Sequence, residues 1–282
     1  TQYEGWFYEG AGIYRHVWLN ITDKVFIPND GVFVHSKVNG KNATVTIETE
    51  VENKNLQPSN AVVYSIITDR NGKQLAKTSE QKVPLSVFGK ATIKQNLNLN
   101  NVTFWSLENP YLYKVISVVK SGNQMVHQKK TRFGIKTVKF DSKEGFFLNG
   151  KKIKIQGTNN HQDHAGIGSA LPDFMQYYRV KLLKEMGSNA YRASHNAPTP
   201  ELLEACDSLG MLVVDEQRLL NSSPEYIKQF KRLIKRDRNH ASVFLWSIGN
   251  EEQNIQGNDY GKRIAKTLLA IQEELDPTRA ST

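Results

Sequence analysis

From about residue 145 onward, short apolar runs alternate with amphipathic helical patterns, and this alternation constrains the fold more than any other feature. Repeated strand–helix units predict a parallel sheet, because each helix carries the chain back across the sheet. A doubly wound sheet and a TIM barrel both fit, although no phosphate-binding glycine loop follows a strand. A barrel normally needs eight units, so it would be present here to about its first half. The four predicted strands are residues 153–157, 189–193, 211–216 and 243–247.

Four helices are predicted after these strands. Asp173 is expected to cap the first helix, which ends at Gly187. Thr199 and Pro200 are expected to open the second helix, which Gly210 closes. The expected apolar faces are Met175, Tyr178, Leu182 and Met186 on the first helix, Leu202, Leu203, Cys206 and Leu209 on the second, Ile227, Phe230, Leu233 and Ile234 on the third, and Ile264, Leu268, Ile271 and Leu275 on the fourth.

The chain before residue 145 has a different rhythm. In residues 42–52, apolar and polar side chains alternate, and the same alternation occurs in residues 61–68, 91–99 and 112–120. Short strands of this kind, separated by turns and without a long helical pattern, predict an antiparallel sandwich of about a hundred residues. The dipeptides Asn39-Gly40, Asn71-Gly72 and Ser121-Gly122 predict hairpin turns between these strands.

Polar side chains gather where the predicted parallel strands end. In a barrel the carboxyl ends of the strands form the active face. Asn250 and Glu251 directly follow the apolar strand at 243–247 and are the first candidates for chemistry. The four strand ends read NNHQDH at residues 159–164, YRASHN at 191–196, DEQR at 215–218 and GNEE at 249–252.

Glu251 and Glu216 are the carboxylates best placed for acid–base work. Glycoside hydrolysis needs two carboxyl groups across the scissile bond, one of them protonated, and a half-buried strand end would raise the pKa of Glu251 as required. The alternative is that Glu251 only caps the following helix. Arg192 lies on a strand, so it is expected to pair with Asp215, Glu216 or Glu251, either as a structural salt bridge or to position a carboxylate.

The histidines after the first strand allow three interpretations. His161, Asp163 and His164 are ligand types for zinc, but their spacing lacks the helical i, i+4 pattern and a third ligand with a general base would be needed. They could instead hold the loop by hydrogen bonds. They could also bind substrate hydroxyls, which suits a neutral imidazole.

Charge and composition exclude little. The net charge is +9 with a pI near 9.4, but Lys and Arg are spread along the chain without an Arg-rich stripe, so a solvated basic surface is favoured over a nucleic-acid partner. There is no apolar run of membrane-spanning length and no signal-peptide pattern in the first residues. The lone Cys206 cannot form an internal disulfide. The compartment stays open: a periplasmic or secreted location is a guess, and a cytoplasmic one is possible.

Several segments together resemble glycoside hydrolase family 2, the group of β-galactosidases, β-glucuronidases and β-mannosidases. The segment DRNHASVFLWSIGNE at 237–251 is similar to the family's acid/base signature, and NAYRASHNAPTP at 189–200, running on to VVDE at 213–216, is similar to its other signature. Further similar segments are GFFLNGK at 145–151, GTNNH at 157–161, WSLENPYLY at 105–113, RFGIK at 132–136 and GWFYEGAGIYR at 5–15.

The resemblance implies a domain order. Residues 1–22 would be the terminal strand of a sugar-binding jelly roll, 23–140 an immunoglobulin-like β-sandwich, and 141–282 the first half of a (β/α)8 TIM barrel. The fold class expected is therefore multidomain, β plus α/β.

The resemblance also implies roles for the candidate residues. Glu251 would be the general acid/base of a retaining mechanism, with Asn250 on the sugar's 2-hydroxyl. His161, Arg192 and His195 would line the sugar subsite, and Glu216 would be a pocket residue. The nucleophile would be a second glutamate on a later strand, absent from this chain. No cofactor or metal site is expected in this chain, although Na⁺ or Mg²⁺ near Glu216 or Glu251 is plausible in the parent enzyme.

The expected activity is hydrolysis of terminal β-D-galactosides by a parent enzyme of which this chain is an inactive fragment. A β-glucuronidase or β-mannosidase, a non-catalytic carbohydrate-binding module and a metal-dependent hydrolase are the alternatives. The expected partner is a β-galactoside, without nucleic acid or a membrane span, and a homo-oligomer is possible. Half a barrel would leave two open sheet edges, which costs stability.

Overall fold

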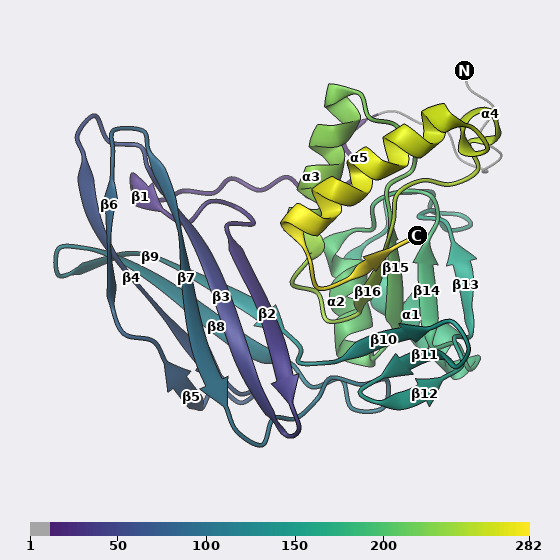
Figure 1. The fold of residues 1–282 in the computed structure, drawn as a ribbon, viewed down its shortest axis with the longest axis horizontal. Coiled ribbons are helices and arrows are strands. Elements are labelled where there is room, and N and C mark those ends of the chain that lie inside the picture. The colour runs from purple at the N-terminus through teal and green to yellow at the C-terminus, as the bar shows by residue number, and fades with distance from the viewer. Residues whose placement is uncertain (1–11) are drawn as a thin grey trace.

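The computed structural model describes residues 12–282 as a β-sandwich joined to an α/β body (Figure 1). The sandwich extends to Phe133, and a short antiparallel sheet leads into the α/β body. The jelly-roll strand expected at residues 1–22 lies partly outside the described residues. Within its described part, residues 12–22 form no strand.

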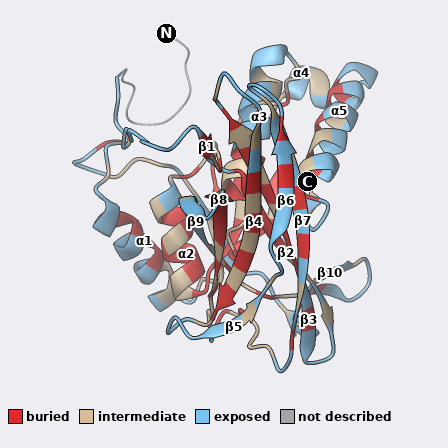
Figure 2. Cartoon of the chain, turned by 90° about the vertical axis from the view of Figure 1, so that its left-hand side faces the viewer, coloured by how far each residue is buried: buried red, intermediate tan, exposed pale blue. Residues whose placement is uncertain are grey.

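Two antiparallel sheets form the sandwich, as the alternating sequence predicts. Inward residues of β4 (Ser59–Thr68) alternate with less buried ones, and the same alternation runs along β7 (Lys90–Leu99), as Figure 2 shows. The inward residues of both sheets share one apolar core. The first sheet also contains β1 (Val25–Phe26), β2 (Val32–Asn39) and β3 (Asn42–Asn53), and the second also contains β5 (Gln74–Lys77), β6 (Gln81–Leu85), β8 (Tyr113–Ser121) and β9 (Gln124–Phe133).

A three-stranded antiparallel sheet closes the amino-terminal end of the parallel strands (Figure 1). Its side chains Phe146 and Leu148 belong to one buried cluster with Leu212 and Phe244, which lie near the starts of two parallel strands. This cluster is the floor of the α/β body. The sheet consists of β10 (Val138–Asp141), β11 (Gly145–Leu148) and β12 (Lys151–Ile153).

The prediction that residues 153–157 form the first parallel strand is wrong. Ile153 ends β12, where it pairs with Phe146 of β11 in an antiparallel register. The first parallel strand is β13 (Gly157–Asn160), and a Cβ at Gly157 would lie 2.3 Å from the carbonyl oxygen of Ala190 on the neighbouring strand. The close approach of these two backbones therefore requires a glycine where the parallel sheet begins.

Five parallel strands, rather than the predicted four, lie side by side in chain order. The fifth, β17 (Ala280–Ser281), pairs with β16 through Leu245 and Trp246. Sequential order with a helix between neighbours is the topology of a TIM barrel, and here β13 and β17 form the two edges. The middle strands are β14 (Ala190–Ala193), β15 (Leu212–Glu216) and β16 (Val243–Ser247).

The second predicted helix is confirmed in detail. The hydroxyl of Thr199 accepts a hydrogen bond from the amide of Leu202, Pro200 is the first helical residue, and Gly210 ends the helix at a φ of 75°. A Cβ at Gly210 would also lie 2.4 Å from the carbonyl oxygen of Leu107. The helices are α1 (Asp173–Glu185), α2 (Pro200–Leu209), α3 (Pro224–Asp237), α4 (Gln253–Gln256) and α5 (Asp259–Leu275).

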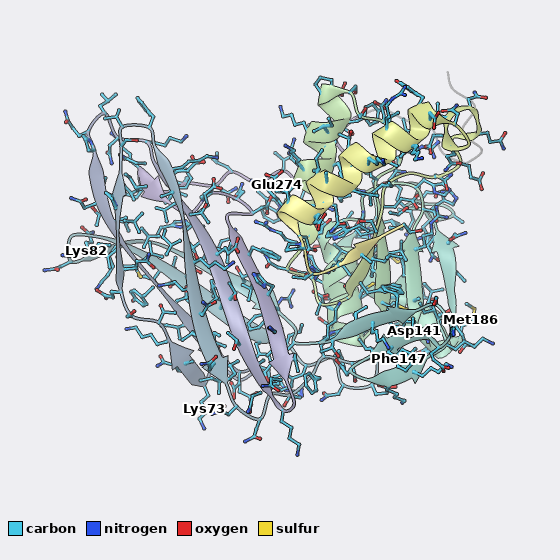
Figure 3. All side chains as sticks on the ribbon, viewed as in Figure 1. Lys73, Lys82, Asp141, Phe147, Met186 and Glu274 are labelled. Carbon is cyan, nitrogen blue, oxygen red and sulfur yellow. The ribbon has the colours of Figure 1, made fainter. Side chains whose placement is uncertain are left out.

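The predicted buried face of α1 is only partly correct. Met175 is buried, but Tyr178 and Leu182 are nearly half exposed and Met186 points outward at 67% exposure (Figure 3). The face of α1 that packs against α2 contains Val180, which is buried instead of Tyr178 and Leu182. Asp173 is the first helical residue rather than a cap, and its carboxylate contacts His16 at 2.8 Å. Within residues 12–282, none of the helices has both the length and the apolar character needed to cross a membrane.

The sandwich and the α/β body meet through specific hydrogen bonds. Asn239 binds the backbone of β2 on both sides, donating to the Val32 carbonyl at 2.8 Å and accepting from the Val34 amide at 2.9 Å. The fully buried indole of Trp105 donates to the backbone carbonyl of Asp207 at 2.8 Å. We call this contact region the seam. It lies at the end of the parallel sheet away from the polar strand ends.

Candidate active site

Glu216, at the carboxyl end of β15, is the centre of a hydrogen-bond network at the polar strand ends. Its side chain is fully buried. Its carboxylate accepts from Arg192 Nε at 2.8 Å and from Ser247 Oγ at 3.0 Å, and it lies 2.7 Å from His195 Nδ1. Since an ionised carboxylate can only accept, His195 Nδ1 carries the proton in this contact. Three side chains from two strand ends, those of β14 and β16, are thus oriented by one buried carboxylate.

Arg192 extends this network across the sheet. It forms the strand-borne salt bridge that its position predicts, with Glu216 as the partner at 2.6 Å from Nη2. The same nitrogen donates to the amide oxygen of Asn250 at 2.8 Å, and Nη1 reaches Asn159 at 3.4 Å. Arg192 therefore joins the ends of β13, β14, β15 and the loop after β16 into one rigid surface.

The loop after β16 is held at Asn250. The backbone N–H of Asn250 donates to Glu252 Oε2 at 3.1 Å, and its backbone carbonyl accepts from the side-chain amide of Gln256. Glu251 between these anchors is exposed, which corrects the expectation of a half-buried strand end. The physical reason is that β16 ends at Ser247, so Glu251 stands four positions beyond the sheet.

His161 faces His195 on the rim of the network. Their ring centroids are 5.5 Å apart at an interplanar angle of 86°. Desolvation lowers the pKa of His161, and neighbouring positive charges, including that of Arg192, act in the same direction. A neutral imidazole, which can both donate and accept a hydrogen bond, is the form suited to a sugar hydroxyl.

A different group of residues has metal-ligating geometry. Among residues 12–282, the group of three or more candidate ligands within 4.8 Å of one another is His16, Asp173 and Glu201, at the surface beside the starts of α1 and α2. His161, Asp163 and His164 do not form such a group. Carboxylates at helix starts are stabilised by the helix dipole without any ion.

A cavity of about 590 Å³ adjoins the network. Arg192, Ser247 and Asn250 line it together with the apolar side chains of Val214 and Leu245. Val214 lies two positions before Glu216 on β15 and shares its face of the sheet, so this space is the open interior of the five-stranded part of the barrel.

The sequence predicted Glu216, Arg192, His195 and Asn250, and the structure brings these four together. It missed Ser247, Asn159 and Gln256, which hold their side chains or backbone in place. Position alone offered a signal for Ser247, a hydroxyl residue at the last position of a buried strand.

Family models match almost the whole described chain. The model of glycosyl hydrolases family 2 matches residues 25–136, and the TIM barrel domain model of the same family matches residues 138–223 and 220–282. The chain belongs to glycosyl hydrolase family 2. The predicted family resemblance is therefore confirmed, and with it the sandwich followed by part of a TIM barrel.

Curated relatives of the family bear two different activity names. The chain is 35% identical over 258 residues to Beta-galactosidase BoGH2A of Bacteroides ovatus, covering 86% of this chain and 30% of the relative. It is 31% identical over 265 residues to a beta-glucuronidase of Formosa agariphila, covering 88% of this chain and 27% of the relative. The chain thus spans about a third of the length of these relatives.

Solved structures of the family agree with the fold. A family 2 member from Bacteroides cellulosilyticus superposes with a TM-score of 0.91 at 32% identity, covering 98% of this chain and 37% of that one. The Bacteroides uniformis beta-glucuronidase superposes with a TM-score of 0.85 at 28% identity, covering 96% and 35%.

Proposed function

We propose that this chain carries the acid/base half of the active site of a retaining β-glycosidase. The observation that supports it most is the network around Glu216, which orients Arg192, His195 and Asn250 at the carboxyl ends of the barrel strands. This is the face where barrel enzymes bind substrate. Glu251 stands next to Asn250, at the mouth of that network.

Glu251 acts in both steps of the proposed reaction. As an acid it protonates the oxygen of the leaving group, and as a base it later removes a proton from water. Its exposed position leaves it accessible to both a leaving group and water.

Asn250, His161, Arg192 and His195 hold the sugar. Because Arg192 occupies the amide oxygen of Asn250, the NH₂ group of Asn250 is turned toward the opposite side, where it can donate to the 2-hydroxyl. Glu216 accepts from Arg192 and His195, so it positions these residues and does not attack the sugar.

The nucleophile belongs to a part of the longer protein beyond this chain. A retaining glycosidase needs a second carboxyl group about 5 Å from the first. We therefore expect the 282-residue chain alone to be inactive. Turnover of an aryl β-glycoside by the purified chain alone would contradict this expectation.

The principal test is Glu251→Gln in the longer protein. We expect kcat/KM for an aryl β-glycoside to fall about a thousandfold, in keeping with the reach of general acid–base catalysis. Glu273→Gln, which changes an exposed glutamate of α5, is the matched control and is expected to leave kcat/KM unchanged. Unchanged kcat/KM in Glu251→Gln would contradict the proposed acid/base role of Glu251.

We propose β-galactosides as the substrate class, supported by the name of the Bacteroides ovatus relative. The beta-glucuronidase name of the Formosa agariphila relative supports the competing assignment. The ratio of kcat/KM values for nitrophenyl β-galactoside and nitrophenyl β-glucuronide decides between them. A preference for the glucuronide would overturn the galactoside proposal but not the glycosidase.

The residues around Glu216 do not fit a Na⁺ or Mg²⁺ site. Its carboxylate is already bonded to Arg192, His195 and Ser247, and a cation would have to displace these positive or donating groups. The mechanism above therefore uses no ion, and activity is expected to survive treatment with a chelator.

A further inference from the structure

Asp215, the residue before Glu216 on β15, is a buried carboxyl group that the proposed mechanism does not use. Side chains alternate along a strand, so Asp215 and Glu216 point to opposite faces of the sheet. Asp215 is fully buried, and neither of its oxygens has a hydrogen-bond donor. A carboxylate in this setting would be a buried charge without compensation, at a cost of several kcal/mol.

The charges near Asp215 are already matched among themselves. Asp237, at the end of α3, is also fully buried and receives two hydrogen bonds from Arg236, at 2.7 Å from Nε and 2.6 Å from Nη2. Arg236 also donates to the carbonyl of Pro198 at 2.7 Å. Asp30 of the sandwich, Arg15 of the amino-terminal segment and His240 also act electrostatically on this pair. The bidentate pair with Asp237 matches the charge of Arg236, and Nε and Nη2 of the guanidinium are bonded to Asp237 rather than to Asp215.

Asp237 is the neighbour that can accept a hydrogen bond from a protonated Asp215. Two carboxylates cannot both be charged at close range in a buried site, but one acid and one carboxylate form a strong O–H···O hydrogen bond. We propose that Asp215 is a neutral carboxylic acid that donates its hydrogen to Asp237, and that this bond positions Glu216. A carboxylate at Asp237 has no hydrogen to donate, so the hydrogen of this bond has to come from Asp215.

The electrostatics agree with this geometry. Burial raises the pKa of Asp215 well above its ordinary value, and the charge of Asp237 raises it further, while Arg236 and the backbone amide of Glu216 act in the opposite direction. An acid with a raised folded-state pKa stabilises the fold fully below the ordinary pKa of aspartate, about 3.9. That contribution is lost as the pH rises through the raised value.

The consequence for the active site rests on the proposed function. Asp215 fastens the end of β15 to the end of α3, and the next residue, Glu216, orients Arg192 and His195. Loss of the shared proton would place two like charges together behind Glu216 and loosen that strand end. Asp215 is therefore a positioning residue, and its ionisation is expected to lower both stability and kcat as the pH rises through its raised pKa.

The test is Asp215→Asn in the longer protein. The asparagine amide can donate to Asp237 as the acid does, but it cannot ionise. At neutral pH we expect both the equilibrium constant for unfolding and kcat to stay within about threefold of the wild-type values. At alkaline pH we expect the variant to lose less stability and less kcat than the wild type. The same alkaline decline in both proteins would overturn the proposal.

Infrared difference spectroscopy provides a readout that does not depend on activity. At neutral pH, wild type minus Asp215→Asn should show the carbonyl stretch of a protonated carboxylic acid. Asp141→Asn is the matched control, because a hydrogen bond with Lys139 and backbone amide donors lower the pKa of Asp141 to about 2, and it should show only a carboxylate band. A carboxylate band for Asp215 would contradict the proposal.

The two outcomes separate this inference from the proposed function. If the acid band is present but Glu251→Gln keeps its activity, the shared proton stands and the acid/base role proposed for Glu251 fails. If Glu251→Gln is inactive but the acid band is missing, the glycosidase stands and the shared proton does not.

Discussion

Two histidine–carboxylate pairs of equal length lie at opposite ends of the parallel sheet, and they differ in what surrounds them. In the site pair, His195 Nδ1 is 2.7 Å from Glu216. In the seam pair, His240 Nδ1 is 2.7 Å from Asp207. Both carboxylates are buried, and both imidazoles are 17% exposed. Neither distance nor burial therefore distinguishes a functional pair from a structural one.

The connections of the two carboxylates do distinguish them. Asp207 binds the backbone amide of Ser242 at 2.7 Å, and its own carbonyl accepts from Trp105, so its contacts fasten the chain to itself. Among the described residues, the Glu216 carboxylate binds the side chains of His195, Arg192 and Ser247, and through Arg192 it reaches Asn250. A carboxylate that orients side chains beside a cavity prepares a binding surface, whereas one that binds backbone fixes the fold.

The largest expected effect is on the seam. His240→Ala leaves Asp207 as a buried charge without its imidazole, so the free energy of unfolding should fall by about 3–5 kcal/mol. Urea unfolding measures this loss. The kcat/KM of the folded fraction should change less than about twofold, and a large loss of kcat/KM at unchanged stability would contradict the structural role.

The same substitution in the site pair should reverse the outcome. His195→Ala is expected to lower kcat/KM about a hundredfold, equivalent to about 2.7 kcal/mol of transition-state stabilisation. The free energy of unfolding should fall by only about 1 kcal/mol, because Arg192 and Ser247 still satisfy Glu216. If the two histidine variants behaved alike, the distinction between the pairs would fail.

Two serines give a matched comparison of smaller size. Ser247→Ala removes a hydrogen bond to the charged Glu216, so we expect a loss of about 1.5 kcal/mol in stability and about tenfold in kcat/KM. The buried hydroxyl of Ser242 has no partner in the described structure, while its backbone amide binds Asp207. Ser242→Ala keeps that amide and should be nearly neutral in both measurements.

The smallest effect is the pH dependence of the seam. Burial lowers the pKa of His240, but the Asp207 carboxylate outweighs it, so the pKa of His240 is raised. The stabilisation is complete below the ordinary histidine pKa of about 6.5 and is lost as the pH rises through the raised value. The difference in unfolding free energy between wild type and His240→Ala should therefore shrink with rising pH, by at most about 1.4 kcal/mol per unit. A constant difference would contradict the assignment.

The sequence predicted the rhythm of this fold better than its small elements. The strand Val243–Ser247 has the predicted limits, because five consecutive apolar or small residues need burial on both faces. In contrast, β17 has two residues, too few for any periodicity, and exists because β16 pairs with it. The predicted strand 153–157 is split between two sheets: Ile153 ends β12, where it pairs with β11, and Gly157 begins β13.

The candidate site was predictable at the level of strand ends and not at the level of contacts. Parallel register places Arg192 opposite Val214, two residues before Glu216, and this brings together side chains 24 positions apart. The sequence named both residues but left the partner of Arg192 open among three carboxylates. The exposure of Glu251 could not be predicted, because it depends on where β16 ends and on what packs beyond it.

We propose Glu251 as the general acid, and the dependence of kcat/KM on the leaving group tests this role directly. The longer protein and its Glu251→Gln variant would be compared in kcat/KM on aryl β-glycosides of rising leaving-group pKa. A poor leaving group needs protonation and a good one does not. We expect kcat/KM to fall about a thousandfold for the poorest leaving group and by progressively less toward the best leaving group. An equal loss for every leaving group would contradict it.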